Sequence, residues 1–305
     1  MTVARNRRAV HGVLVADKPR GPSSTQLLGR VRHLYAAAKA GHGGTLDPMA
    51  TGLLPILLGD ATKFAQEGLD ADKSYEADLL LGTTTTTGDA EGEPLQTRPV
   101  RVSAEAVAAI LPRFTGPLEQ YPPMYSALKH QGRPLYAYAR EGQTVVRTPR
   151  TVQIHRLELV SCSPPRLSLR VDCSKGTYIR TLAEDIGEAL GCGAHLVGLR
   201  RTRVGRLTLE SSHSLEALEV ASMSERDSWL QPVDFLIQDW PSIALGPEDA
   251  QRFLHGNPVQ PRGLEPTEPD RRMRVISSNE NFIGVGVIRA GQLHPQRLLS
   301  QNPTP

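Results

Sequence analysis

The stretch GHGGTLDPMAT at residues 41–51 is the most unusual part of the chain. Three glycines within four residues allow positive φ angles and a close approach of the backbone to a ligand. Asp47 follows them, and Pro48 restricts the backbone at this point. A carboxylate fixed in this way suits nucleophilic or acid–base chemistry at a sugar carbon. A plain turn explains the same residues, because Gly-Gly and Asp-Pro both form turns. The stretch alone leaves both interpretations open.

The surrounding sequence predicts a mixture of strands and helices. The apolar run GVLVA at 12–16 predicts a strand, and Ser23 or Ser24 can cap the helix after it. Further helices are expected after Ser103 and from Ile179 to Gly191. The polar stretch 82–93 is expected to be a mobile loop. Further strands are predicted at 75–81, 152–160, 166–173 and 195–209.

The pattern changes near Pro232–Pro241, where we place a domain boundary. A helix is expected over 247–254, followed by a Pro- and charge-rich segment at 261–272, strands at 273–277 and 282–288, and a frayed end. The predicted fold class is α+β, with a first domain at 1–235 and a small β-rich domain at 236–305.

Charge and cysteine content narrow the class of protein. The 305 residues carry a net charge of +3, with 39% hydrophobic and 22% charged residues. Two arginine clusters suit phosphate contacts, although a solvated surface explains them equally well. They are Arg5, Arg7 and Arg8, and Arg200, Arg201, Arg203 and Arg206. Three cysteines without a C-x-x-C pair favour buried free thiols over disulfides or zinc. No signal peptide or membrane span is visible, so we expect a cytoplasmic protein.

Six segments, in order, resemble the TruB family of pseudouridine synthases over residues 10–210. The central one is GHGGTLDPMATGLLPILLGDATKFAQ, in which Gly43 stands where the family commonly has threonine. The others are VLVADKP at 13–19, KSY at 73–75, PMYSALK at 123–129, CSKGTYIRTL at 173–182 and GCGAHLVGLRR at 191–201. The resemblance implies a catalytic domain with a large mixed, mainly antiparallel sheet flanked by helices. The C-terminal part resembles a PUA-type RNA-binding module.

The resemblance implies catalytic roles for three residues. Asp47 matches the family's catalytic aspartate, which either attacks the anomeric carbon or removes a proton from C2′; the sequence does not choose between these routes. Arg180 matches the arginine that pairs with it, and a guanidinium can hold a carboxylate bidentately. Enzymes of this family must flip the target uridine out of the folded RNA to reach it. Tyr75 matches the tyrosine that stacks on this flipped base and assists proton removal at carbon 5.

Five residues are expected to bind substrate or to support the site. Tyr178 and Leu199 match positions that line the uracil pocket, although their pattern by itself favours core residues. His42 matches a histidine that contacts RNA near the flipped nucleotide. Lys18 and Lys63 are candidates for supporting the site or binding phosphate. No metal and no cofactor are expected.

The expected activity is isomerisation of uridine 55 in the T-loop of tRNA. The partner is the tRNA T-arm, without a membrane or a required protein partner, and a monomer is expected. Three alternatives stay open: a glycosidase or nucleosidase, a tRNA-folding chaperone, and the RNA-guided relative of archaea and eukaryotes. A glycosidase usually needs two flanking carboxylates, and no second acidic residue lies in a comparable loop. The short N-terminus favours the stand-alone bacterial type over the RNA-guided one.

Overall fold

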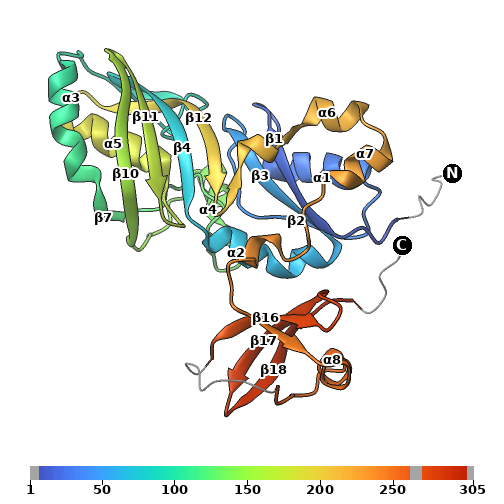
Figure 1. Cartoon of the computed structure of the whole chain (residues 1–305). Coiled ribbons are helices and arrows are strands. Elements are labelled where there is room, and N and C mark those ends of the chain that lie inside the picture. Colours follow the sequence, from blue (N-terminus) through green and yellow to red (C-terminus); the bar gives the residue numbers. More distant parts are fainter. Residues whose placement is uncertain (1–6, 262–269, 301–305) are drawn as a thin grey trace.

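A large mixed sheet forms the centre of the molecule in the computed structural model, which describes residues 7–261 and 270–300 (Figure 1). Its strands follow the order β14-β1-β3-β12-β4-β11-β10-β7, with β2 beside β3 and β13 beside β12. The β1–β14 and β3–β12 pairs are parallel and the other described pairs are antiparallel, as predicted. The strands are β1 (Gly12–Lys18), β2 (Ala40–His42), β3 (Thr51–Leu58), β4 (Lys73–Leu81), β7 (Gly116–Gln120), β10 (Arg150–Ser163), β11 (Arg166–Cys173), β12 (Ala194–Val204), β13 (Leu207–Thr208) and β14 (His213–Ser214).

Two apolar cores pack against this sheet. Helices α1 (Ser24–Leu34) and α6 (Leu215–Val220) cover β1 and β3, and α3 (Ala104–Ile110) and α5 (Ile179–Ala189) cover β4, β10, β11 and β12. Alternate residues of β1 and β3, such as Val13 and Leu57, pack on the opposite face. These two strands are therefore buried on both faces, which explains their continuous apolar runs.

The remaining elements of the first part are short. The helices are α2 (Ala65–Asp70), α4 (Leu135–Arg140) and α7 (Met223–Ser228), and the 3₁₀ turns are η1 (Gly59–Phe64), η2 (Leu111–Phe114), η3 (Leu209–Ser211) and η4 (Phe235–Ile237). Two small hairpins lie outside the main sheet: β5 (Thr83–Thr85) with β6 (Pro94–Thr97), and β8 (Lys129–His130) with β9 (Arg133–Pro134).

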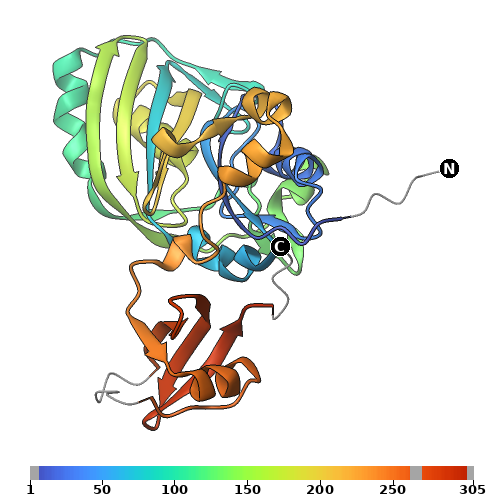
Figure 2. The ribbon, with the colours of Figure 1, turned by 45° about the vertical axis from the view of Figure 1, so that its right-hand side comes forward.

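The C-terminal part is a separate four-stranded sheet with one helix (Figures 1 and 2). It consists of β15 (Ser242–Leu245), α8 (Pro247–Leu254), β16 (Arg272–Ser277), β17 (Phe282–Arg289) and β18 (Gln292–Leu298), which confirms the expected helix and both expected strands. The Pro- and charge-rich segment falls largely on 262–269 and the expected frayed end on 301–305, both outside the described residues.

The two parts are in close contact. The rings of Phe64 and Phe282 lie 5.7 Å apart. The backbone N–H and the hydroxyl of Ser300 donate to the carboxylate of Asp60 at 2.7 and 2.9 Å. The predicted boundary at 235/236 falls inside η4, which packs against both parts. Its exact position therefore stays a prediction.

The helix predictions hold in their capping detail. Ser23 is the N-cap of α1, in a capping box with Gln26. Ser103 caps α3, and Gly191 follows α5 with a φ of +77°. All three cysteines are free, and Cys162 is half-buried rather than buried.

The expectation of a mobile loop at 82–93 is wrong. Residues 83–85 form β5, and Asp89 is 2% exposed. Asp89 accepts hydrogen bonds from the hydroxyl of Thr87 and the backbone N–H of Glu91. Local composition indicated a polar loop, but the internal bonds of the loop and its contact with α5 order it.

Candidate active site

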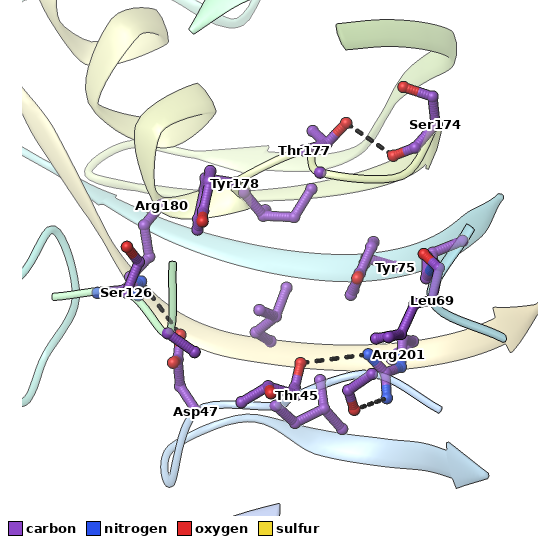
Figure 3. Close-up of a pocket in the computed structure, with 17 residues that line it drawn as sticks. Thr45, Asp47, Leu69, Tyr75, Ser126, Ser174, Thr177, Tyr178, Arg180 and Arg201 are labelled. Atoms are coloured by element: carbon purple, nitrogen blue, oxygen red, sulfur yellow. Dashed lines mark hydrogen bonds and ion pairs between the residues drawn. The ribbon is translucent and has the colours of Figure 1, made fainter. Parts of the chain in front are cut away.

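A pocket of about 270 Å³ lies between the glycine-rich loop that carries Asp47 and the start of α5. Figure 3 shows this pocket with the residues that line it. Asp47 and Arg180 lie at one end, and Leu69 and Ser174 at the other. The lining residues come from distant parts of the chain: 44–47, Leu69, Lys73, Tyr75, Ser126, Ala127, Ser174, 176–180, Leu199 and Arg201.

Buried polar side chains hold the loop that carries Asp47. The hydroxyl of Ser24 donates to Leu46 O at 3.0 Å and accepts from Leu46 N–H at 2.8 Å. The ammonium group of Lys18 donates to Pro48 O at 3.2 Å and to Ala50 O at 2.6 Å. Every one of these bonds is to the backbone on either side of Asp47. The loop is therefore a built support for one carboxylate rather than a plain turn.

Arg201 holds the same loop from the other side. Its side chain is 1% exposed and donates to Leu53 O at 2.8 Å, Gly44 O at 3.2 Å and Thr45 O at 3.4 Å. Gly44 has a φ of +132°, in the region that favours glycine, and its carbonyl reaches this guanidinium.

Asp47 and Arg180 form an ion pair at the end of the pocket. Nε of Arg180 lies 3.1 Å from the Asp47 carboxylate. The two terminal nitrogens of Arg180 donate instead to Thr87 O at 2.9 Å and Tyr125 O at 2.6 Å. The pair is therefore not the bidentate fork considered from the sequence, because the backbones of two other segments take the remaining donors.

Asp89 is a second carboxylate on the same guanidinium. It lies 3.7 Å from Nη1 of Arg180 and is buried. Burial raises the pKa of Asp47, Arg180 lowers it, Asp89 raises it and Lys18 lowers it, and the net shift is upward. The net effect of the surroundings therefore disfavours the ionised form of Asp47, although the charge of Arg180 favours that form.

The pocket walls are aromatic and aliphatic. Tyr75 projects from β4, Tyr178 precedes α5 and Leu199 lies on β12, and all three line the pocket (Figure 3). Burial raises the pKa of Tyr75, and the nearby charge of Arg201 offsets this only in part. Such walls suit a flat ring held by stacking.

The other three expected site residues do not line the pocket. His42 ends β2, and its buried Nδ1 has no hydrogen-bond partner among the described residues. Burial and Arg201 lower its pKa, so the neutral ring is favoured. Lys18 is fully buried beneath the Asp47 loop, which fits support of the site rather than phosphate binding. Lys63 bonds Leu298 O at 2.7 Å and pairs with Asp60 at 2.5 Å, at the contact between the two parts.

Three family models match consecutive parts of the sequence. The TruB family pseudouridylate synthase N-terminal domain matches residues 32–179, and the tRNA pseudouridylate synthase B C-terminal domain matches 180–238. The C-terminal model of pseudouridine synthase II TruB matches 241–299. The chain is also 55% identical over 297 residues to a tRNA pseudouridine synthase B of Burkholderia mallei, covering 96% of this chain and 98% of that one.

The chain belongs to the TruB family of pseudouridine synthases. A tRNA pseudouridine synthase B of Cupriavidus metallidurans is 52% identical over 299 residues, covering 96% of this chain and 95% of that one. Among solved structures, a crystal structure of a Cbf5–Nop10–Gar1 complex aligns with a TM-score of 0.72 and 25% identity, covering 94% of this chain and 84% of that one. The whole TruB-family fold is therefore present, including its C-terminal part.

In this TruB-family chain part of the second arginine cluster is used in internal contacts, while Arg206 is exposed, so phosphate binding by this cluster stays a prediction. Arg201 is buried in the site, Arg200 pairs with Asp17 at 2.7 Å and Arg203 donates to Ser74 at 2.9 Å. Of the first cluster, Arg8 pairs with Asp227, and Arg5 lies outside the described residues. Charge alone did not reveal which guanidinium groups are used internally.

Sequence reasoning missed four residues of the site: Lys73, Asp89, Ser126 and Arg201. One signal could have found Arg201. Side chains two positions apart on a strand share a face, so a pocket-lining Leu199 places Arg201 on the pocket side as well. Lys73 donates to three carbonyls at the end of α2, a contact that sequence spacing does not predict. Asp89 reaches the site through its contact with Arg180, and Ser126, from the quoted segment 123–129, lines the pocket.

Within the described residues, no group of three or more His, Cys, Asp or Glu side chains is placed to hold a metal ion. Over the same ranges, no helix has the length and apolar character needed to cross a membrane.

Proposed function

We propose that this chain converts uridine 55 in the T-loop of tRNA to pseudouridine, with Asp47 as the catalytic nucleophile. The observation that carries the proposal is one reactive carboxylate, paired with Arg180, at the end of a pocket with ring-stacking walls. The pocket volume of about 270 Å³ lies just below the roughly 300–1,000 Å³ of sites for drug-sized molecules, which is consistent with a smaller occupant such as one flipped base. The tRNA substrate is supported by the names of the relatives.

The reaction is an isomerisation, so its atoms balance without a co-reactant. The bond between C1′ and N1 breaks, the uracil turns in the pocket, and a bond forms between C1′ and C5. The proton on C5 leaves and N1 gains one. Asp47 acts on the sugar by attack at C1′ or by taking the proton at C2′, and both routes need it ionised. Arg180 favours this state and directs the carboxylate.

The pocket walls fit the remaining steps. Tyr178 and Leu199 are placed to hold the detached uracil, which must stay bound while it turns. Tyr75 is placed on the same wall as a group that takes the C5 proton. Burial raises the pKa of its phenol overall, and the charge of Arg201 opposes this only in part.

A glycosidase with paired carboxylates is the weaker alternative. Asp89 is a second carboxylate near Asp47, but it is buried on Arg180 and does not line the pocket. It cannot flank a glycosidic bond held in that pocket. Its contacts suit orientation of Arg180 instead.

The test uses an unmodified tRNA transcript, without added cofactor. Wild type, Asp47→Asn and a control, Asp270→Asn, are incubated with it, and pseudouridine is mapped by carbodiimide treatment and primer extension. Asp270 is an exposed aspartate in the C-terminal part. We expect one site in the T-loop for wild type and control and none for Asp47→Asn. Tight tRNA binding by all three without any pseudouridine would sink the catalytic proposal and favour a tRNA-folding chaperone. Release of free uracil would favour hydrolysis.

A further inference from the structure

A buried amide at the end of β7 binds the backbone at the start of α5. Gln120 is 1% exposed. The N–H of Tyr178 donates to Oε1 of Gln120 at 3.0 Å, and Nε2 of Gln120 donates to Tyr178 O at 3.3 Å. The amide thus bonds both polar groups of one residue, of which Tyr178 O also accepts from Leu182 N–H at 3.1 Å, and Gln120 itself does not line the pocket.

This contact takes the place of one bond of a local capping box, the bond to the N–H of the N-cap residue. Tyr178 is the N-cap residue of α5, and its own side chain makes no capping bond. The first N–H groups of a helix need partners outside the helix. Two other helices satisfy the corresponding N–H locally: in α1 and α7 the N-cap N–H groups of Ser23 and Ser222 donate to the side chains of Gln26 and Glu225. At α5 a residue 58 positions away supplies it, so the start of α5 depends on where β7 ends.

Two residues after Tyr178 comes Arg180, which pairs with Asp47. The chain that leaves Gln120 also reaches this arginine, because Tyr125 O accepts from its Nη2 at 2.6 Å. The segment 120–125 therefore contacts the start of α5 at two points, one on the backbone and one on the guanidinium. A shift of Tyr178 would move both a wall of the pocket and the base of the Arg180 side chain.

We propose that Gln120 is a positioning residue for the reaction, whose amide sets the start of α5 so that Arg180 holds Asp47 and Tyr178 forms the pocket wall. This inference rests on the proposed function. It predicts a loss in the chemical step rather than in tRNA binding, since Gln120 lies behind the pocket.

The test compares Gln120→Glu with Gln120→Met over a pH range. An ionised carboxylate accepts from Tyr178 N–H but cannot donate to Tyr178 O, which it then faces. The protonated acid restores both bonds. We expect kcat at saturating tRNA to fall about tenfold or more in both variants near pH 8, with a smaller change in KM. As the pH falls, the ratio of Gln120→Glu to wild type should rise, while that of Gln120→Met should stay low.

The charges near the introduced carboxyl set where the recovery begins. Burial raises its pKa. Arg150 on β10 is the register partner of Gln120 on β7. Arg180 lies two residues beyond Tyr178. Both cations favour the ionised form and move the recovery toward lower pH. Each rate is taken relative to wild type at the same pH, and Gln120→Met, which introduces no titrating group, shows how much of any change comes from an altered titration of Asp47.

Gln96→Glu is the matched control, because Gln96 is an exposed glutamine on β6 and should keep wild-type kcat throughout. Thermal unfolding at each pH identifies folded protein, and if Gln120→Met does not fold, the pH dependence of Gln120→Glu decides alone. A folded Gln120→Glu with kcat within about twofold of wild type near pH 8, or with a loss that does not change with pH, overturns the inference. An inactive wild type would instead remove the proposed function, and this inference with it.

Discussion

Replacing Arg201 by methionine should destabilise the fold and disable the site together. The substitution keeps an unbranched buried side chain but removes the donors for Leu53 O, Gly44 O and Thr45 O. A buried carbonyl left without a donor costs about 1–3 kcal/mol. Removing the buried cation recovers part of this free energy, because no carboxylate among the described residues forms an ion pair with Arg201 and its desolvation cost is no longer paid. The net loss should be about 3 kcal/mol.

A loss of this size should lower Tm by about 6–12 °C for a domain of more than 150 residues. The loop would also shift Asp47 against its substrate, and a displacement near 1 Å can cost about 100-fold in kcat. The assays are thermal unfolding and pseudouridine formation at saturating tRNA.

The matched control for Tm is Arg200→Met, one residue earlier. Arg200 is part-exposed and pairs with Asp17, a contact worth about 0–1 kcal/mol. An Arg201→Met protein with Tm within about 2 °C of wild type and an unchanged kcat would refute the support that we assign to Arg201.

Three further predictions follow from the same contacts. Because burial raises the pKa of Asp47, the acid limb of the pH profile of kcat/KM should lie at a pH above the ordinary pKa of 3.8. Asp89→Asn removes a charge that raises this pKa, so it should move the acid limb to lower pH. An acid limb at pH 3.8 in the wild type would contradict the burial effect. A Cβ at Gly43 would lie 3.3 Å from Pro55, so urea unfolding should show Gly43→Thr less stable by about 1–3 kcal/mol and Gly43→Ala less affected; an equally stable threonine variant would mean that the loop relaxes. Lys63→Met should speed protease cleavage between the two parts but keep kcat within about twofold, and a large loss of kcat would instead place Lys63 in the site.

Local chemistry made part of this structure predictable. The continuous apolar run of β1, the serine caps of α1 and α3 and the glycine stop of α5 are local signals, and they hold. The prediction of a mobile loop at 82–93 was wrong because the order of this segment depends on the hydrogen bonds of Asp89 and on its contact with Arg180, which lies on another element. A window of sequence contains the residues of the internal bonds but not Arg180, which buries Asp89 and orders the loop.

The same distinction applies to the site. Asp47, Arg180, Tyr75, Tyr178 and Leu199 were named from motifs, and the fold brings them around one pocket. The details differ from what the motifs implied. Arg180 meets Asp47 through Nε alone, because the backbones of Thr87 and Tyr125 take its other nitrogens.

The sequence by itself determined the family and the fold class, and it singled out Asp47 as the carboxylate that we propose to be reactive, because these depend on ordered motifs and local periodicity. Only the tertiary structure decided which charged groups are internal supports. Lys18 and Arg201 look like surface cations in the sequence, yet each is buried and bonded to backbone carbonyls. The contact between Arg201 and Leu53 spans 148 residues. Burial of a charge depends on partners from distant elements, and only the folded chain supplies them.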